Sequence, residues 1–358
     1  MPDVSVVIPS YNHAGYIAAA IQSVLKQTYA DFELIVVDDG SVDDSLEVIS
    51  GFTDPRMRVI TQKNQGAHSA INRGLQESSG RYLAILNSDD AYHPQRLEKA
   101  IRVLEEDPSI GLLGTFIEVV DHQSNHLGVK HGYQDFEPWP IEIVERSFRA
   151  GSDLRAALLT ENYFATTSNY IFGHDWYERV GEFRPLRYAH DWDFALRMAR
   201  LARLELLPEP LMRYRVHPKN TIRENQAAMI FEICWCLAVH LPSHFSDEHF
   251  FREHSMDLRL DQLVNSIYTY SCERILSAML VQNISSDRER SLSLLQPGDP
   301  AREIYLEYIT RQLASRNQNE NNLQVDFTPL QDPNLPFWLR SMQRLWRSTK
   351  ALLNAHGQ

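Results

Sequence analysis

The chain has 358 residues, of which 43% are hydrophobic and 23% charged, and it carries a formal net charge of −12 at pH 7. A chain of this length buries a substantial core without disulfide or metal staples. The acidic balance excludes general electrostatic attraction to nucleic acid, so a phosphate-bearing ligand would need a metal ion or a local cluster of hydrogen-bond donors.

The first part of the chain alternates short β-branched runs with helix-like segments. Val4 to Ile8 reads "VSVVI", which is typical of a strand buried on both faces. Further strands are predicted at 33–37, 58–61, 81–86 and within 110–120, and helices at 17–27, 43–52, 67–77 and 94–106. This order predicts an α/β fold with a mostly parallel central sheet flanked by helices, in which ligands bind beyond the carboxyl ends of the strands.

The rest of the chain is predicted to be less regular. Residues 121–140 are polar and are expected to form a long loop, and more sheet and helix follow through 169–172 and 192–201. From about residue 224 apolar residues recur at helical spacing. The predicted organisation is a sheet domain at 1–223, a helical extension at 224–315, a linker at 316–336 and a basic amphipathic helix at 337–358.

Cysteine usage and the absence of targeting signals indicate a reducing compartment. Cys234 and Cys236 form a C-W-C pair, and neither Cys272 nor a set of histidines completes a zinc site, so buried free thiols are expected. No secretory signal is visible, and no apolar run reaches the length of a membrane span. We therefore expect a cytoplasmic protein.

Two acidic clusters follow predicted strands. Asp38 and Asp39 open "DDGS", where carboxylates can accept hydrogen bonds from a base or ribose; a helix cap is the structural alternative. Asp89 and Asp90 close "NSDD", and two adjacent carboxylates are costly to hold together without a cation. Such oxygen ligands suit Mg²⁺ or Mn²⁺, whereas a solvated acidic turn is the alternative.

Two further motifs carry candidate chemistry. Asp191, in "YAHDWDF" at the opening of a predicted helix, is flanked by aromatic residues and is a plausible general base, with a helix cap as the alternative. In "YRVHP", Arg215 and His217 could face a phosphate or a metal, although a His-Pro pair is more often a structural turn.

The order and spacing of these motifs resemble the family 2 glycosyltransferases, which adopt the GT-A fold. The matching stretches, over roughly the first two thirds of the chain, are "VSVVIPSYNHAGYIAAAIQSVLKQTYADFELIVVDDGSVDDS", "NQGAHSAINRGL", "GRYLAILNSDDAYHPQRLE", "NYFATTSNYIFGHDWYERVGEFRPLRYAHDWDFALRMAR" and "YRVHPKNTI". The resemblance implies an inverting transfer of one sugar from a nucleoside-diphosphate sugar, with UDP the expected carrier, to an acceptor hydroxyl. It also implies a divalent metal, Mn²⁺ or Mg²⁺.

The resemblance assigns roles by position. Asp191 corresponds to the catalytic base, Asp90 to the direct metal ligand, and His217 to a further metal or diphosphate contact. The residues implied to bind the nucleotide sugar are Pro9, Tyr11, Asn12, Asp38, Asp39, Asn64, Gly66 and Asp89. Two positions depart from the family pattern: Asn87 stands where many members have aspartate, and His190 where many have glutamate. We expect Asn87 still to offer an oxygen, and His190 to alter the pKa of the base or the choice of acceptor.

The expected setting is assembly of a bacterial surface polysaccharide or glycolipid, with a saccharide or lipid-linked saccharide as acceptor and with self-association left open. Residues 337–358 either contact the inner face of the membrane peripherally or pack on protein. The alternative function is a non-catalytic nucleotide-sugar-binding or scaffold protein with the same fold.

Overall fold

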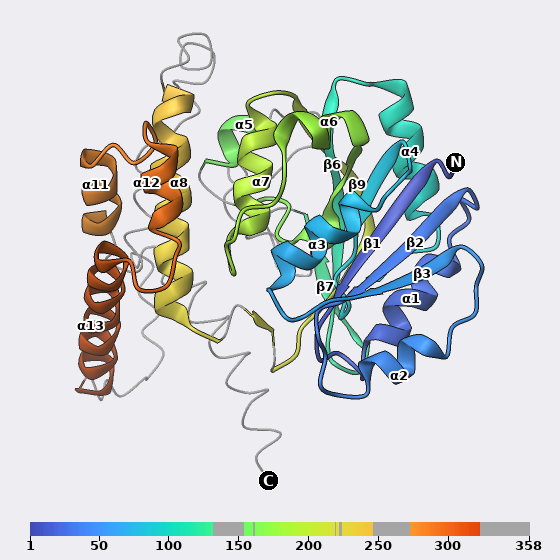
Figure 1. Cartoon of the computed structure of the whole chain (residues 1–358), viewed down its shortest axis with the longest axis horizontal. Coiled ribbons are helices and arrows are strands. Elements are labelled where there is room, and N and C mark those ends of the chain that lie inside the picture. Colours follow the sequence, from blue (N-terminus) through green and yellow to red (C-terminus); the bar gives the residue numbers. More distant parts are fainter. Residues whose placement is uncertain (132–153, 160–161, 219, 222–223, 246–272, 323–358) are drawn as a thin grey trace, which may run out of the picture. The chain divides into compact units, whose positions relative to one another are not determined.

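A computed structural model describes the chain except for residues 132–153, 160–161, 219, 222–223, 246–272 and 323–358 (Figure 1). The chain divides into two compact units, Met1–Leu313 and Ala314–Gln358. All the sites discussed below lie in the first unit. Of the second unit, the structure describes only the end of one helix, up to Asn322.

One sheet of nine strands organises the described part of the first unit. Its strands are β1 (Val4–Ser10), β2 (Phe32–Asp38), β3 (Met57–Thr61), β4 (Tyr82–Ile85), β5 (Ala91–Tyr92), β6 (Ile110–Val120), β7 (His126–Lys130), β8 (Ile171–Gly173) and β9 (Arg203–Arg215). Their order across the sheet is β3-β2-β1-β4-β8-β6-β9-β5, and β7 pairs with β6. The mixed α/β architecture with a mostly parallel sheet is confirmed.

The parallel strands end together. β1 pairs in parallel with β2 and β4, and β2 with β3, so that Ser10 lies opposite Asp38, and Asp38 opposite Thr61. β8 is antiparallel to both β4 and β6, and β9 is parallel to β6, so β9 ends at the same edge as β1 and β4. Residues from widely separated motifs therefore gather at this edge.

Helices flank the sheet and extend beyond it (Figure 1). They are α1 (Ile17–Leu25), α2 (Ser45–Ser50), α3 (Ala67–Gln76), α4 (Arg96–Glu106), α5 (Leu154–Ala157), α6 (His174–Val180), α7 (His190–Ala199), α8 (Gln226–Phe245), α11 (Glu273–Val281), α12 (Arg288–Ser293) and α13 (Pro300–Asn322). A short 3₁₀ turn, η2 (Thr167–Asn169), precedes β8.

The two faces of the sheet bury separate hydrophobic clusters. Along β1, Val4, Val6 and Ile8 belong to the cluster that includes α1 and α4, whereas Val7 belongs to the cluster that includes α3, α7 and α8. This alternation follows from the two-residue period of a strand. Burial on both faces explains why the central strands read as continuous apolar runs rather than alternating ones.

Three sequence predictions differ from the structure. Residues 121–140 were expected to be a loop, but His126–Lys130 form β7, a short strand that pairs with β6 through its backbone groups. No strand was predicted at 203–215, which form the long strand β9, whereas the turn that was the alternative at "YRVHP" is present at Pro218. Helix α13 continues to Asn322, into the predicted linker. The rest of that linker and the predicted helix at 337–358 lie outside the described residues.

Helix α8 is long and apolar enough, over Gln226–Ser243, to cross a membrane by length and composition, contrary to the expectation from sequence. It is the one such helix among the residues that the structure describes, and 56% of that window is buried. Its side chains include the fully buried Trp235 and the buried free thiols Cys234 and Cys236. It therefore packs as a core helix, and the free thiols expected at these two cysteines are confirmed.

Candidate active site

The loops after β1 and β2 are joined to each other by hydrogen bonds. The Asn12 side chain accepts a hydrogen bond from the Val42 amide at 2.8 Å, and the Asn12 amide donates to the Ser41 hydroxyl at 3.0 Å. Asn12 has a φ of 54°, in the left-handed region that asparagine tolerates better than most residues. Beside it Pro9 is buried, whereas Tyr11 is exposed and presents an aromatic ring at the edge of the sheet.

Asp38 has an unused hydrogen-bond acceptor. Its Oδ2 accepts a hydrogen bond from the Ser41 amide at 3.0 Å, but its buried Oδ1 has no partner among the described residues. The hydroxyl of Ser10, opposite Asp38 on β1, is also buried and unpaired in that part of the chain. A buried polar atom without a partner is costly, so these atoms are suited to bind polar groups of a ligand.

Asp39 organises the loop that connects β3 to α3. Its carboxylate accepts hydrogen bonds from the Gln62 side chain at 2.7 Å, the Gln65 amide at 2.9 Å and the Gly66 amide at 2.8 Å. Gly40 approaches the same loop so closely that a Cβ there would lie 2.9 Å from the Asn64 backbone nitrogen. The structure thus brings together Asp39, Asn64 and Gly66, three residues that the sequence resemblance assigns to binding of the nucleotide sugar.

The turn after β4 separates the roles of its two aspartates. Asp90 is 1% exposed, and its carboxylate accepts hydrogen bonds from the Ser168 hydroxyl at 2.5 Å and the Arg215 amide at 2.9 Å. Burial and the neighbouring Asp89 raise the pKa of Asp90 well above its ordinary value. Both oxygens of Asp90 are thus used inside the protein. Asp90 as the direct metal ligand stays a prediction, and Asp89 is a second candidate for that role.

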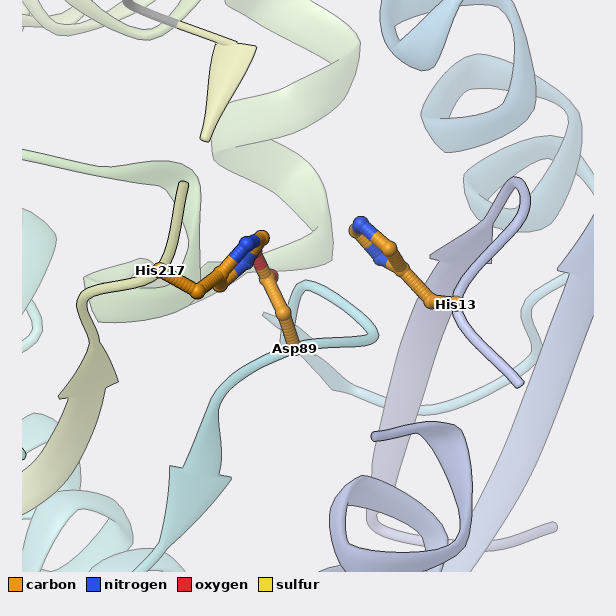
Figure 2. A group of neighbouring side chains, drawn as sticks. All are labelled: His13, Asp89 and His217. Carbon is orange, nitrogen blue, oxygen red and sulfur yellow. The ribbon is translucent and has the colours of Figure 1, made fainter. Parts of the chain in front are cut away.

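Asp89 lies in a cluster with two histidines (Figure 2). One potential ligand atom each from His13, Asp89 and His217 lies within 4.8 Å of the other two. The His217 Nε2 is 3.0 Å from Asp89 Oδ2, and the His13 Nδ1 is 2.7 Å from the Ser88 hydroxyl. Burial raises the pKa of Asp89, but the hydrogen bond from His217 and the charges of both imidazoles outweigh it, so the net shift is downward.

The donor set of this cluster fits a divalent transition metal. Two imidazoles and a carboxylate are ligands that such ions accept, and ligand bonds of about 2.1 Å place two ligand atoms at most about 4.2 Å apart. Small side-chain rotations would bring the three residues to that spacing. His13 and Asp89 come from the loops after β1 and β4, and His217 follows β9, so the cluster depends on three strand ends.

Arg215 fixes the turn that carries Asp89. Its Nε donates to the Asp89 carbonyl at 2.9 Å, and its Nη1 donates to the Asp121 carbonyl at 3.2 Å and to the Ser124 hydroxyl at 2.8 Å. The guanidinium also lies over the Tyr16 ring, 5.4 Å from its centroid. Arg215, which the sequence offered as a phosphate or metal contact, therefore supports the cluster through the backbone.

Asp191 is a buried carboxylate at the start of α7. Its Oδ1 accepts a hydrogen bond from the Trp192 amide at 2.7 Å, and its Oδ2 accepts one from the Asn162 side chain at 2.9 Å. Its own carbonyl accepts a hydrogen bond from the Tyr170 hydroxyl at 2.7 Å. Burial raises the pKa of Asp191 to about 6, which the two hydrogen bonds only partly oppose. A carboxylate of this pKa is suited to take a proton near neutral pH.

The two departures from the family pattern have structural explanations. Asn87 donates to the Thr166 hydroxyl at 3.0 Å and accepts from the Thr167 hydroxyl at 2.9 Å, so its side-chain oxygen is hydrogen-bonded within the protein. Burial lowers the pKa of His190 to about 4, so the residue is neutral near pH 7. Burial, rather than His190, is the main cause of the raised pKa of Asp191, and an effect of His190 on the choice of acceptor stays a prediction.

Some contributors were not predicted. His13 was assigned no role from the sequence. A histidine just after a strand that ends at the ligand-binding edge of the sheet does, however, indicate a candidate metal ligand. Asn162, the first residue of the matching stretch that begins "NYFATT", donates a hydrogen bond to Asp191. Glu232 and His240 on α8 contact residues around Asp191, and the sequence held no signal for either.

Comparisons with known sequences find similarity to glycosyltransferases. Residues 5–181 match the profile described as Glycosyl transferase family 2. An uncharacterized glycosyltransferase of Haemophilus influenzae is 31% identical over 226 residues, which cover 62% of this chain and 67% of that protein. The chondroitin synthase of Escherichia coli is 33% identical over 198 residues, 52% of this chain but only 28% of the synthase. A Nostoc relative is matched over 66% of its length.

Solved structures show the same fold at low sequence identity. The structure of S. aureus TarS 1-349 in complex with UDP has a TM-score of 0.56 and 19% identity, covering 88% of this chain and 91% of that one. The mannosyltransferase PcManGT from Pyrobaculum calidifontis, in complex with GDP-Man and Mn²⁺, has a TM-score of 0.53 and 18% identity, covering 90% and 87%.

Proposed function

The chain belongs to glycosyl transferase family 2 and has the GT-A fold, and from this premise we propose that it moves one sugar from a nucleoside-diphosphate sugar to an acceptor hydroxyl with inversion at the anomeric carbon. One observation carries the proposal. The chain places a metal-type cluster at the carboxyl edge of its sheet and, at the start of α7, a carboxylate whose pKa is about 6. Inverting transfer requires both a leaving-group stabiliser and a base.

The donor is proposed to bind across the ends of β1, β2 and β4. The unpaired oxygens of Asp38 and Ser10 and the exposed Tyr11 ring offer hydrogen bonds and a stacking surface to a base or ribose. Asp39 holds the 62–66 loop that would cover one side of the nucleotide. A uridine carrier is proposed first, since UDP is bound by the TarS structure, with GDP as the second candidate from the mannosyltransferase.

The diphosphate is proposed to lie against His13, Asp89 and His217. A divalent cation held by these residues would neutralise the charge that develops on the leaving group. Because two of the three residues are imidazoles, Mn²⁺ should bind better than Mg²⁺, which prefers oxygen ligands. Asp90 and Arg215 contribute by holding the turn beneath Asp89.

The transfer itself is proposed to depend on Asp191. Its carboxylate accepts the proton of the acceptor hydroxyl while that oxygen forms a bond to the anomeric carbon. The bond from that carbon to the diphosphate oxygen breaks, and the nucleoside diphosphate leaves with the electron pair. The hydrogen bonds from Asn162 and Trp192 fix the direction of the carboxylate. A positioned base supplies about 10²–10⁴-fold in rate.

The wider setting is also a proposal. We infer a role in assembling a bacterial polysaccharide or glycolipid on the cytoplasmic side of the membrane. The support is the family and the similarity to chondroitin synthase, a polysaccharide-forming enzyme by its name. The alternative, a non-catalytic nucleotide-sugar-binding protein, would keep the donor site without turnover.

The donor site is tested by calorimetry with UDP-, GDP- and dTDP-sugars, with Mn²⁺, with Mg²⁺ and without metal. We expect one donor to bind at least tenfold more tightly with Mn²⁺ than with Mg²⁺. Asp89→Ala and His13→Ala should each weaken metal-dependent binding, whereas Glu106→Ala, at an exposed acid that ends α4, should not. Absence of donor binding under all conditions would contradict the proposed function.

The base is tested by turnover of Asp191→Asn. We expect kcat to fall by about 10²–10⁴-fold while donor affinity stays within about twofold of wild type, because the residue acts on the acceptor proton. In the wild type, kcat/KM should fall below about pH 6, since protonated Asp191 cannot accept a proton. A variant as active as wild type would rule out Asp191 as the base.

A further inference from the structure

A buried glutamate on α8 binds the turn that leads into α7. The carboxylate of Glu232 accepts hydrogen bonds from three successive backbone amides, those of Arg187 at 2.9 Å, Tyr188 at 2.6 Å and Ala189 at 3.0 Å. Glu232 is 8% exposed, and burial raises its pKa although the three amides oppose that shift. Burying a carboxylate costs free energy, and here three charge-assisted hydrogen bonds to the backbone of residues 187–189 offset that cost.

The turn that Glu232 binds has no cap of its own. Ala189 is the N-cap residue of α7, and its side chain offers no hydrogen bond to the helix. The amides just before the helix are therefore satisfied by a residue more than 40 positions away in sequence. Without Glu232 these three donors would lose their acceptor, and the turn could take other conformations.

A second contact ties α8 to the other side of Asp191. The His240 Nε2 is 2.8 Å from the Oδ1 of Asp193, a fully buried carboxylate that also pairs with Arg184 at 2.8 Å and Arg197 at 3.0 Å. Asp193, Cys236 and His240 have metal-ligand spacing, but two guanidinium groups already neutralise the carboxylate. The group is therefore an ion-pair network and is unsuited to a further cation.

Asp191 lies between these two contacts in sequence. The amides of 187–189 precede it and are held by Glu232, and Asp193 follows it and is held by His240. Glu232 and His240 are eight positions apart on α8, a rise of about 12 Å along the helix axis. One helix outside the sheet thus contacts the chain on both sides of the proposed base, through backbone amides before it and through the Asp193 side chain after it.

We propose that α8 is a positioning element of the active site, in which Glu232 and His240 hold the first turn of α7 so that the Asp191 carboxylate meets the acceptor hydroxyl. The inference rests on the proposed function, which it deepens. Catalytic groups need to be held within about 0.5 Å of their productive positions. A displacement of about 1 Å costs about 100-fold in rate, so loosening this turn should affect kcat far more than donor binding.

The test compares Glu232→Gln with Glu224→Gln. Glutamine keeps the size of Glu232 but places an N–H donor against backbone donors. Glu224 is a matched control because it contacts the same turn through the exposed Arg187 side chain rather than through the backbone. His240→Leu is the second variant, since Asp193 keeps both arginine partners and the fold should survive.

Three readouts separate positioning from a general loss of structure. We expect Glu232→Gln to lower kcat by about 10–100-fold with nucleotide affinity within about twofold of wild type. Hydrogen exchange at the amides of 187–189 should accelerate while the amides of β1 stay protected. The acid limb of the kcat/KM profile should move to lower pH, because a loosened turn admits water to Asp191. Glu224→Gln should match wild type in all three.

Two outcomes would overturn the inference. One is unchanged kcat in a folded Glu232→Gln whose 187–189 amides exchange fast, since the turn would then be free without consequence. The other is a Glu232→Gln protein that loses kcat only where its β1 amides also lose protection, together with a His240→Leu protein that keeps its full kcat. That combination would indicate a purely structural role. An inactive Asp191→Asn beside a fully active Glu232→Gln leaves the proposed function standing, and an active Asp191→Asn removes it.

Discussion

At the scale of single residues, two neighbouring aspartates on α7 have opposite environments. Burial raises the pKa of Asp191 to about 6, whereas two arginines and His240 overcome burial and hold the pKa of Asp193 well below its ordinary value. The first carboxylate can exchange a proton near neutral pH, and the second stays charged and structural. Sequence spacing alone does not distinguish the two roles, because each aspartate lies in the first turn of the helix.

This contrast predicts opposite effects on stability. The folded state binds a proton on Asp191 more tightly than the unfolded chain does, so this group costs stability as pH rises from about 4 to 6 and the cost stays above pH 6. A shift of about two pKa units corresponds to about 3 kcal/mol at most. Asp191→Asn should therefore raise the free energy of unfolding at pH 7.5, by about 1–3 kcal/mol, and leave it unchanged at pH 4.

Asp193→Asn is the comparison, measured by urea unfolding at the same two pH values. Its native carboxylate is buried and stabilised by ion pairs, so the variant should lose about 3–5 kcal/mol at neutral pH because two partly buried arginines lose their charged partner. An Asp191→Asn protein that is less stable than wild type at pH 7.5 would argue against a raised pKa for Asp191.

At the scale of elements, α3 packs closely on β1 and β2 because residue 74, at the contact, is a glycine with no side chain. A Cβ on Gly74 would lie 2.3 Å from Val7 Cγ1 and 3.2 Å from Val37 Cγ2. The helix can take this position because glycine leaves room for the strands. Its start follows the 62–66 loop that Asp39 holds, so the close packing also sets where that loop lies.

Gly74→Ala should therefore destabilise the protein by about 1–3 kcal/mol through overpacking, although alanine is the better helix former by about 1 kcal/mol. Gly15→Ala is the control, because a Cβ there meets nothing within 4 Å. Urea unfolding of both variants provides the measurement. Equal stability of the two would mean that α3 does not approach β1 as described.

Elements were also where sequence reasoning succeeded most. β1 and β2 were predictable because continuous β-branched runs mark strands buried on both faces, and the edge that gathers the site follows from their parallel pairing. β7 was missed because it is a five-residue strand within a polar stretch, and it is held by pairing with β6. Strand formation there depends on a partner rather than on the local sequence.

At the scale of the whole molecule, the sequence indicated which motifs form the site but not which atoms face a ligand. Asp89 and Asp90 are chemically identical neighbours, and Ser168, Arg215 and His217 decide which of them turns inward. Likewise Glu232 lies in the helical part of the chain, where the family resemblance ends. Its contact with residues 187–189 is a tertiary contact, which no local sequence pattern predicts.

The pairing of Asp89 with His217 has a consequence for how the protein is made. The two residues are 128 positions apart, and Arg215, which holds the same turn, is 126 positions from Asp89. A ribosome adds about 5–20 residues per second, so roughly 6–25 seconds pass between synthesis of the acidic turn and of its partners. Until then Asp89 and Asp90 lack the hydrogen bonds from Arg215 and His217 that offset the cost of burying their carboxylates, and the turn after β4 stays hydrated. Completion of the donor site therefore waits for β9, and folding of this edge of the sheet proceeds late in synthesis.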